Sequence, residues 1–184
     1  MKYTLNEHPL EPLDKIEAEP DFDQSSFKHV DAARAELNNY CRAIVDAMLR
    51  HVSKRRKYLY VFVGIEDFRE GDPSGFWHLD TTLNPVRAYE NFLFVAGVNT
   101  TEFAINQLEI EEARSAKDLH DQVEALTLRK VQIPPFTIIR YYEGNVHRKP
   151  LVQKDEKRLL IRLSNTDAFK PELHFGRATT GITS

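Results

Sequence analysis

The stretch FWHLDT (residues 76–81) guides the interpretation of the whole sequence. In a strand, residues two apart point to the same face, so His78 and Asp80 would present an imidazole and a carboxylate side by side. His147, in the run VHR (residues 146–148), would add a second imidazole from another strand. Two histidines and one carboxylate on one side of a metal leave its other positions open, an arrangement typical of Fe(II). The sequence therefore predicts that these three residues bind one divalent metal, with iron as the first choice.

Two alternatives compete with this interpretation. A His-x-Asp pair alone is a weak signal, and a histidine between two large apolar residues can be a core residue with one satisfied hydrogen bond. His174 is a rival for the third ligand. We favour His147 because it follows a turn at residues 143–145 and would begin a new strand, a setting that His174 lacks.

Composition narrows the functional classes. A chain of 184 residues with 41% hydrophobic and 29% charged residues predicts a single globular domain with a substantial core. Its net charge of -3 disfavours nucleic acid as a partner. The four cations at 54–57 are interpreted as the solvated end of a helix rather than a phosphate-binding patch. A single cysteine, Cys41, excludes an intramolecular disulfide and a multi-cysteine metal site.

The chain shows no signal for secretion or membrane insertion. Its first residues lack the apolar run of a signal peptide, and no apolar stretch approaches the length that spans a bilayer. We therefore expect a cytoplasmic protein without a membrane partner, and its oligomeric state stays open.

The predicted organisation is one mainly β domain over residues 1–184 with covering helices. Residues 1–28, rich in proline and acidic residues, form an irregular arm with room for a short strand, packed on the domain. Residues 30–53 form an amphipathic helix that covers a sheet. Residues 58–165 form the β core, and residues 166–184 form a tail. Within the core we expect a short helix opening at Ser115 and strands at 58–65, 76–80, 86–95, 101–108, 128–133, 136–142, 146–148 and 158–164.

Short, regularly spaced strands are typical of a sandwich or barrel. Together with His78-Leu79-Asp80, His147 and Arg162-Leu163-Ser164, they resemble the jelly-roll (double-stranded β-helix) fold of the Fe(II)/2-oxoglutarate-dependent dioxygenases. The resemblance covers roughly residues 58–165. It implies that His78, Asp80 and His147 bind iron, which 2-oxoglutarate chelates through its keto and C1-carboxylate oxygens.

The resemblance also implies an anchor for the distal carboxylate of 2-oxoglutarate. Arg162 and Ser164 match an Arg-x-Ser arrangement on the strand after the second histidine, and a guanidinium grips a carboxylate through two parallel hydrogen bonds. Arg158 is the rival anchor, because alternation places it on the same face as Arg162. A hydroxyl from Tyr141 or Tyr142 could help to hold the co-substrate.

The implied activity is oxidation of a second substrate, a small molecule or a peptide, coupled to conversion of 2-oxoglutarate into succinate. Two other classes stay open. One is a cupin-like metalloprotein that uses the same triad without 2-oxoglutarate. The other is a non-enzymatic binding protein on this fold, in which both histidines are ordinary structural residues.

Overall fold

The computed structural model describes residues 1–80 and 89–168, and in these ranges the protein is mainly β, as predicted. All strand pairings are antiparallel. The elements in chain order are β1 (Lys2–Leu5), β2 (Glu11–Lys15), β3 (Phe27–Asp31), α1 (Asn39–Arg50), β4 (Tyr58–Phe68), β5 (Glu90–Ala96), β6 (Glu102–Ala104), β7 (Leu108–Glu111), α2 (Ala116–Glu124), β8 (Lys130–Gln132), β9 (Thr137–Tyr142), β10 (His147–Arg148) and β11 (Glu156–Thr166).

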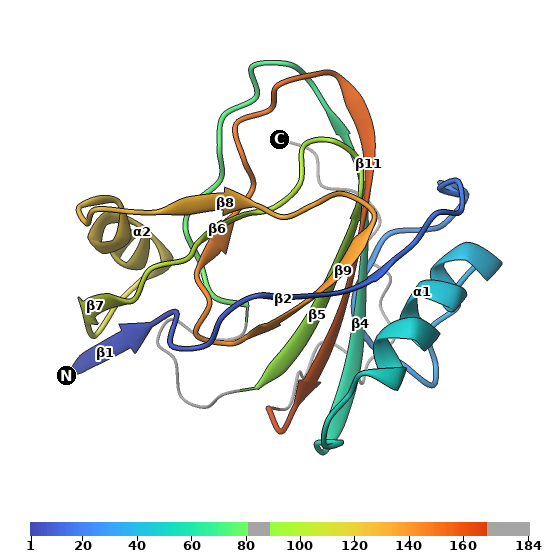
Figure 1. The fold of residues 1–184 in the computed structure, drawn as a ribbon, viewed down its shortest axis with the longest axis horizontal. Coiled ribbons are helices and arrows are strands. Elements are labelled where there is room, and N and C mark those ends of the chain that lie inside the picture. Colours follow the sequence, from blue (N-terminus) through green and yellow to red (C-terminus); the bar gives the residue numbers. More distant parts are fainter. Residues whose placement is uncertain (81–88, 169–184) are drawn as a thin grey trace.

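The large sheet has the strand order β2-β9-β5-β11-β4-β3 (Figure 1). Its centre is β11, which pairs with β4 along its whole length and with β5 on its other side. Alternation along β11 sends Leu159, Ile161 and Leu163 into the core beneath α1, while Leu160 packs on the opposite face. The large sheet is therefore buried on both sides.

Helix α1 covers one face of the large sheet. It begins after Asn38, whose side chain accepts a hydrogen bond from the Cys41 backbone N–H at 2.8 Å. The predicted helix over residues 30–53 was too long, because Val30 and Asp31 belong to β3 and pair with β4. Apolar residues in a strand followed by a turn happened to continue the helical spacing. Cys41 lies on the buried stripe, and burial raises the pKa of its thiol to about 11.

The N-terminal arm, residues 1–28, is more regular than predicted. Strand β1 pairs with β7, strand β2 extends one edge of the large sheet, and β3, which starts at Phe27, extends the other. Pro12 lies within β2, where an edge position tolerates a residue that has no N–H to donate. Pro12 is thus compatible with an edge strand, whereas Pro9 and Pro20 lie in the irregular segments between the strands.

A small sheet, with the order β10-β6-β8, faces the side of the large sheet opposite α1. Phe103 and Ile133 pack there against Leu93, Ile139 and Tyr141 of the large sheet. The outer face of the small sheet is covered by α2 and by the β1-β7 pair. Ser115 caps α2 as predicted, accepting from the Asp118 N–H at 3.0 Å.

Among the described residues, no helix combines the length and the apolar character that crossing a bilayer requires.

The covering role of α1 can be tested at Ile161, which is fully buried beneath it. We expect Ile161→Ala to lower the free energy of unfolding by about 3 kcal/mol, because the change removes buried methylene groups and leaves a cavity. Urea denaturation of the metal-free protein measures this. Val98→Ala, at an exposed position, serves as the control and should change the value by less than about 0.5 kcal/mol. A cost for Ile161→Ala as small as that of the control would contradict the packing described here.

Candidate metal centre

The two histidines of the predicted group lie directly opposite each other on adjacent strand segments. The His78 backbone N–H donates to the His147 carbonyl at 2.9 Å, and the His147 N–H donates to the His78 carbonyl at 3.1 Å. A pair that exchanges both hydrogen bonds has its side chains next to each other on one face of the sheet. The ring centroids are accordingly 4.5 Å apart. Backbone pairing thus brings together two imidazoles that are far apart in the sequence.

Both imidazoles leave the same nitrogen free. Nδ1 of His78 is 2.9 Å from the Phe76 carbonyl oxygen, and Nδ1 of His147 is 2.9 Å from the Asn145 carbonyl oxygen. Because a carbonyl oxygen only accepts hydrogen bonds, each Nδ1 carries the ring proton. Each Nε2 then keeps its lone pair, and the backbone fixes the orientation of each ring, as is usual for metal-binding histidines.

The electrostatic surroundings keep both rings neutral. Burial lowers the pKa of His147 to about 4, against a smaller upward effect of its hydrogen bond to Asn145. The pKa of His78 is also lowered to about 4, first by desolvation of the ring and then by the adjacent His147. His78 is the more exposed of the two residues. At neutral pH both imidazoles are uncharged, which is the form that binds a metal.

Asp80 completes the group from the same segment as His78. Its side chain is only 1% exposed, and its Oδ1 lies 3.4 Å from His147 Nε2. The Tyr141 hydroxyl donates to Oδ2, and the Arg162 guanidinium pairs with Oδ1. Burial raises the pKa of Tyr141 well above its ordinary value, so its hydroxyl stays protonated and acts as the donor. The carboxylate is therefore oriented on both of its oxygens.

Together, His78, Asp80 and His147 can hold a metal ion. One ligand atom from each residue lies within 4.8 Å of the others. Two neutral imidazole nitrogens and one carboxylate oxygen suit a divalent first-row metal such as iron, zinc or manganese. The fixed ring orientations and the buried carboxylate fit such an ion. His174, the rival third ligand, lies outside the described residues.

The two candidate arginines have different surroundings. Arg162 Nη1 contacts Asp80, its guanidinium lies 5.3 Å from the centre of the Phe62 ring, and burial lowers its pKa to about 10. Arg158 instead donates to Glu66 at 2.7 Å and to the Asn99 carbonyl at 3.2 Å. The structure thus brings Arg162, and not Arg158, into contact with the metal group. Ser164 is buried two residues further along β11, on the same strand face as Arg162.

Three neighbours of this group were either missed or left undecided by the sequence. Asn91 lies opposite both Ser164 and Tyr141 in the sheet, and its side-chain nitrogen has no hydrogen-bond partner among the described residues. The Phe62 ring beneath Arg162 occupies space that a Cβ on Gly64 would enter at 3.0 Å. Tyr141 contacts Asp80, whereas the centre of the Tyr142 ring lies 4.6 Å from that of the His8 ring. Alternation along β4 and β5 could have identified Phe62 and Asn91 once the strand pairing was known.

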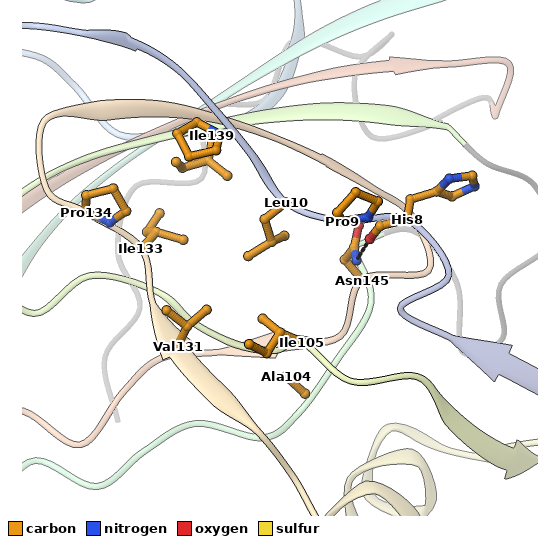
Figure 2. Close-up of a pocket in the computed structure, with 11 residues that line it drawn as sticks. His8, Pro9, Leu10, Ala104, Ile105, Val131, Ile133, Pro134, Ile139 and Asn145 are labelled. Carbon is orange, nitrogen blue, oxygen red and sulfur yellow. Dashed lines mark hydrogen bonds between the residues drawn. The ribbon is translucent and has the colours of Figure 1, made fainter.

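A separate pocket of about 360 Å³ lies between residues 8–12 and strands β6, β8 and β9 (Figure 2). Its lining is mostly apolar, and none of the three ligands belongs to it. Figure 2 shows Asn145 on its wall, donating from its side chain to the His8 carbonyl at 2.8 Å. The Asn145 carbonyl is the acceptor that orients His147. The pocket therefore shares a wall residue with the metal centre but is distinct from it.

Comparison of the chain with protein-family models, with curated proteins and with solved structures finds no match. The function of the protein is therefore inferred from the geometry of this group of residues.

The metal centre can be tested with Asp80→Ala. We expect this change to weaken Co²⁺ binding by more than about 100-fold. Loss of a residue that only hydrogen-bonds to a metal ligand already lowers metal affinity about 10- to 100-fold. Trp77, the only tryptophan of the sequence, adjoins His78 and reports binding through quenching of its fluorescence. His8→Ala removes an exposed histidine outside the group and should leave the affinity unchanged. Equal Co²⁺ affinity of Asp80→Ala and the unmodified protein would exclude Asp80 as a ligand.

Proposed function

We propose that the protein is an Fe(II)- and 2-oxoglutarate-dependent oxygenase that acts on a second, unidentified substrate. The observation that carries the proposal is the convergence of His78, Asp80 and His147, with Arg162 held beside them on the facing sheet. A metal-ligand triad alone fits many metalloproteins. A triad with a buried arginine directed at it also provides for an anionic co-substrate.

The strand order supports a jelly roll as the scaffold. Eight segments are distributed between the two facing sheets, namely β4, the segment at residue 78, β5, β6, β8, β9, β10 and β11. Counted in this order, the first pairs with the eighth, the second with the seventh, the third with the sixth and the fourth with the fifth. A long antiparallel hairpin rolled into two sheets produces such nested pairs, and eight strands in two sheets are typical of a jelly roll.

Charge balance supports a dianionic co-substrate. The negative charge of Asp80 is balanced by the positive charge of Arg162, and the two histidines are neutral. A divalent cation adds two positive charges to a largely buried place, where uncompensated charge is costly. A dicarboxylate such as 2-oxoglutarate supplies two negative charges. Metal and co-substrate together therefore leave the centre neutral.

Arg162 has the donors to receive the distal carboxylate. Its contact with Asp80 uses Nη1, while its Nε has no hydrogen-bond partner among the described residues. The remaining edge of a guanidinium can grip a carboxylate through two parallel hydrogen bonds. Phe62 supports the flat guanidinium from one side, and Ser164 and Asn91 provide polar groups on the same face.

In the proposed reaction each residue has a defined task. The triad would hold the ion, with Tyr141 keeping Asp80 oriented, and Arg162 would bind the co-substrate. Bound Fe(II) with 2-oxoglutarate supplies oxygen activation, in which 2-oxoglutarate and O₂ give succinate and CO₂ while one oxygen atom enters the second substrate. The chain contributes fixed ligand orientation and low solvent exposure around Asp80 and His147.

One observation favours a second candidate, a cupin-like metalloprotein that needs no 2-oxoglutarate. Arg162 already pairs with a metal ligand, so it could serve only as the counter-charge of Asp80. In that case the arginine would influence metal affinity and would bind no co-substrate. Formation of succinate separates the two candidates.

The proposal predicts distinct roles for the two arginines. We expect Arg162→Ala to weaken 2-oxoglutarate binding by about 10- to 100-fold, because it removes charged hydrogen bonds worth about 1.5–3 kcal/mol. It should leave Fe(II) binding intact or tighter, because a cation that pairs with Asp80 is lost. Arg158→Ala should lower stability and leave 2-oxoglutarate affinity unchanged. Anaerobic titration of each Fe(II)-loaded variant with 2-oxoglutarate measures the two affinities for 2-oxoglutarate through the metal-to-ligand charge-transfer band.

The same titration contains its own control. Asp80→Ala should show no charge-transfer band at any 2-oxoglutarate concentration. In air, the unmodified protein should form succinate from 2-oxoglutarate. Normal Fe(II) binding with neither a band nor succinate would reject the oxygenase and favour the second candidate.

A further inference from the structure

A second cross-strand pair lies on the reverse side of the ligand pair. Trp77 precedes His78 and Arg148 follows His147, so the antiparallel pairing also places these two residues opposite each other. Neighbours in a strand point to opposite faces, so their side chains lie away from the metal centre. Trp77 belongs to the apolar cluster between the small sheet and α2, and the Arg148 guanidinium lies 4.3 Å from the centre of its ring. Each ligand-bearing strand therefore contributes one partner to a cation–π contact.

Two carboxylates hold Arg148 in this position. Its Nε donates to Glu102 on β6 at 2.7 Å, and its Nη1 donates to Glu124 at the end of α2 at 2.6 Å. The same Glu124 oxygen accepts from Trp77 Nε1 at 2.5 Å. Glu124 thus joins the residue before one ligand to the residue after the other.

Helix α2 also holds the backbone of the first ligand segment. The segment at residue 78 lies at the edge of the small sheet, with β10 as its neighbour on one side. On the other side, the Trp77 backbone N–H donates to His120 Nδ1 at 3.2 Å. Trp77 is fully buried and the Arg148 side chain is only 12% exposed, so water competes little for these contacts.

We propose that Arg148 is a positioning residue for the metal centre. With Trp77 and Glu124 it sets the separation of the two segments that present His78 and His147, without touching the metal. The inference rests on the proposed metal centre and extends it to the outer face of the small sheet. Arginine suits this task because its planar guanidinium stacks on an indole while donating to two carboxylates, which a lysine ammonium does not do in the same fixed geometry.

The test uses Mn²⁺ alone, followed by titration calorimetry on the full chain. We expect Arg148→Met to raise the Mn²⁺ dissociation constant about tenfold or more, as for other residues that support ligands from outside the coordination shell. Glu124→Gln removes the charge but keeps an acceptor for the indole, and should raise it about threefold. Glu124 is partly exposed, so this variant stays informative if Arg148→Met does not fold.

Arg140→Met is the matched control. Arg140 pairs with Glu11 at 2.8 Å and Glu90 at 3.4 Å and lies 5.7 Å from the Phe92 ring centre, but it faces the α1 side of the large sheet. This change should lower stability and leave the Mn²⁺ dissociation constant within about twofold.

Three outcomes would overturn the positioning role. The first is unaltered Mn²⁺ affinity in folded Arg148→Met, and the second is unaltered affinity in Glu124→Gln if Arg148→Met does not fold. The third is equal weakening in Arg140→Met, which would indicate a general effect of lost stability. Failure of the metal centre itself would look different, because the unmodified protein would then bind no Mn²⁺ or Asp80→Ala would bind it equally well.

Discussion

The candidate metal centre depends on one backbone contact, the pairing of residues 78 and 147. Each residue donates its N–H to the carbonyl of the other, so both imidazoles project side by side from one face. Asp80 joins them through the two-residue alternation of its segment. The pairing is held between two apolar cores, one shared with the large sheet and one beneath α2. The geometry of the centre is therefore a consequence of sheet packing rather than of local sequence.

The second constraint is the buried charge of Asp80. A carboxylate with 1% exposure needs a compensating partner, and Arg162 and the Tyr141 hydroxyl fill that role. Even with its pKa lowered to about 10, Arg162 is protonated at neutral pH. A buried ion pair adds little stability over an apolar replacement, so its presence beside two neutral histidines supports the proposed function of this group.

Alternation predicted what depends on local spacing, and strand pairing determined the rest. Alternation placed His78 beside Asp80 and grouped Arg158 with Arg162 and Ser164. The capping residue Ser115 located the start of α2. Alternation could not show that residue 78 pairs with 147, because pairing is a tertiary property. The same limit explains the helix predicted too early, at Val30, since only β4 reveals that residue as part of a strand. Asn91 went unnoticed because its face was defined only by Ser164 and Tyr141 on the neighbouring strands.

The most direct measurement is anomalous X-ray scattering at the manganese edge from crystals of the protein grown anaerobically with Mn²⁺. The account predicts one strong peak within bonding distance of Nε2 of His78, Nε2 of His147 and a carboxylate oxygen of Asp80, with both Nδ1 atoms still donating to their carbonyls. A peak bound by other residues, or none at this group despite stoichiometric Mn²⁺ in solution, would contradict it.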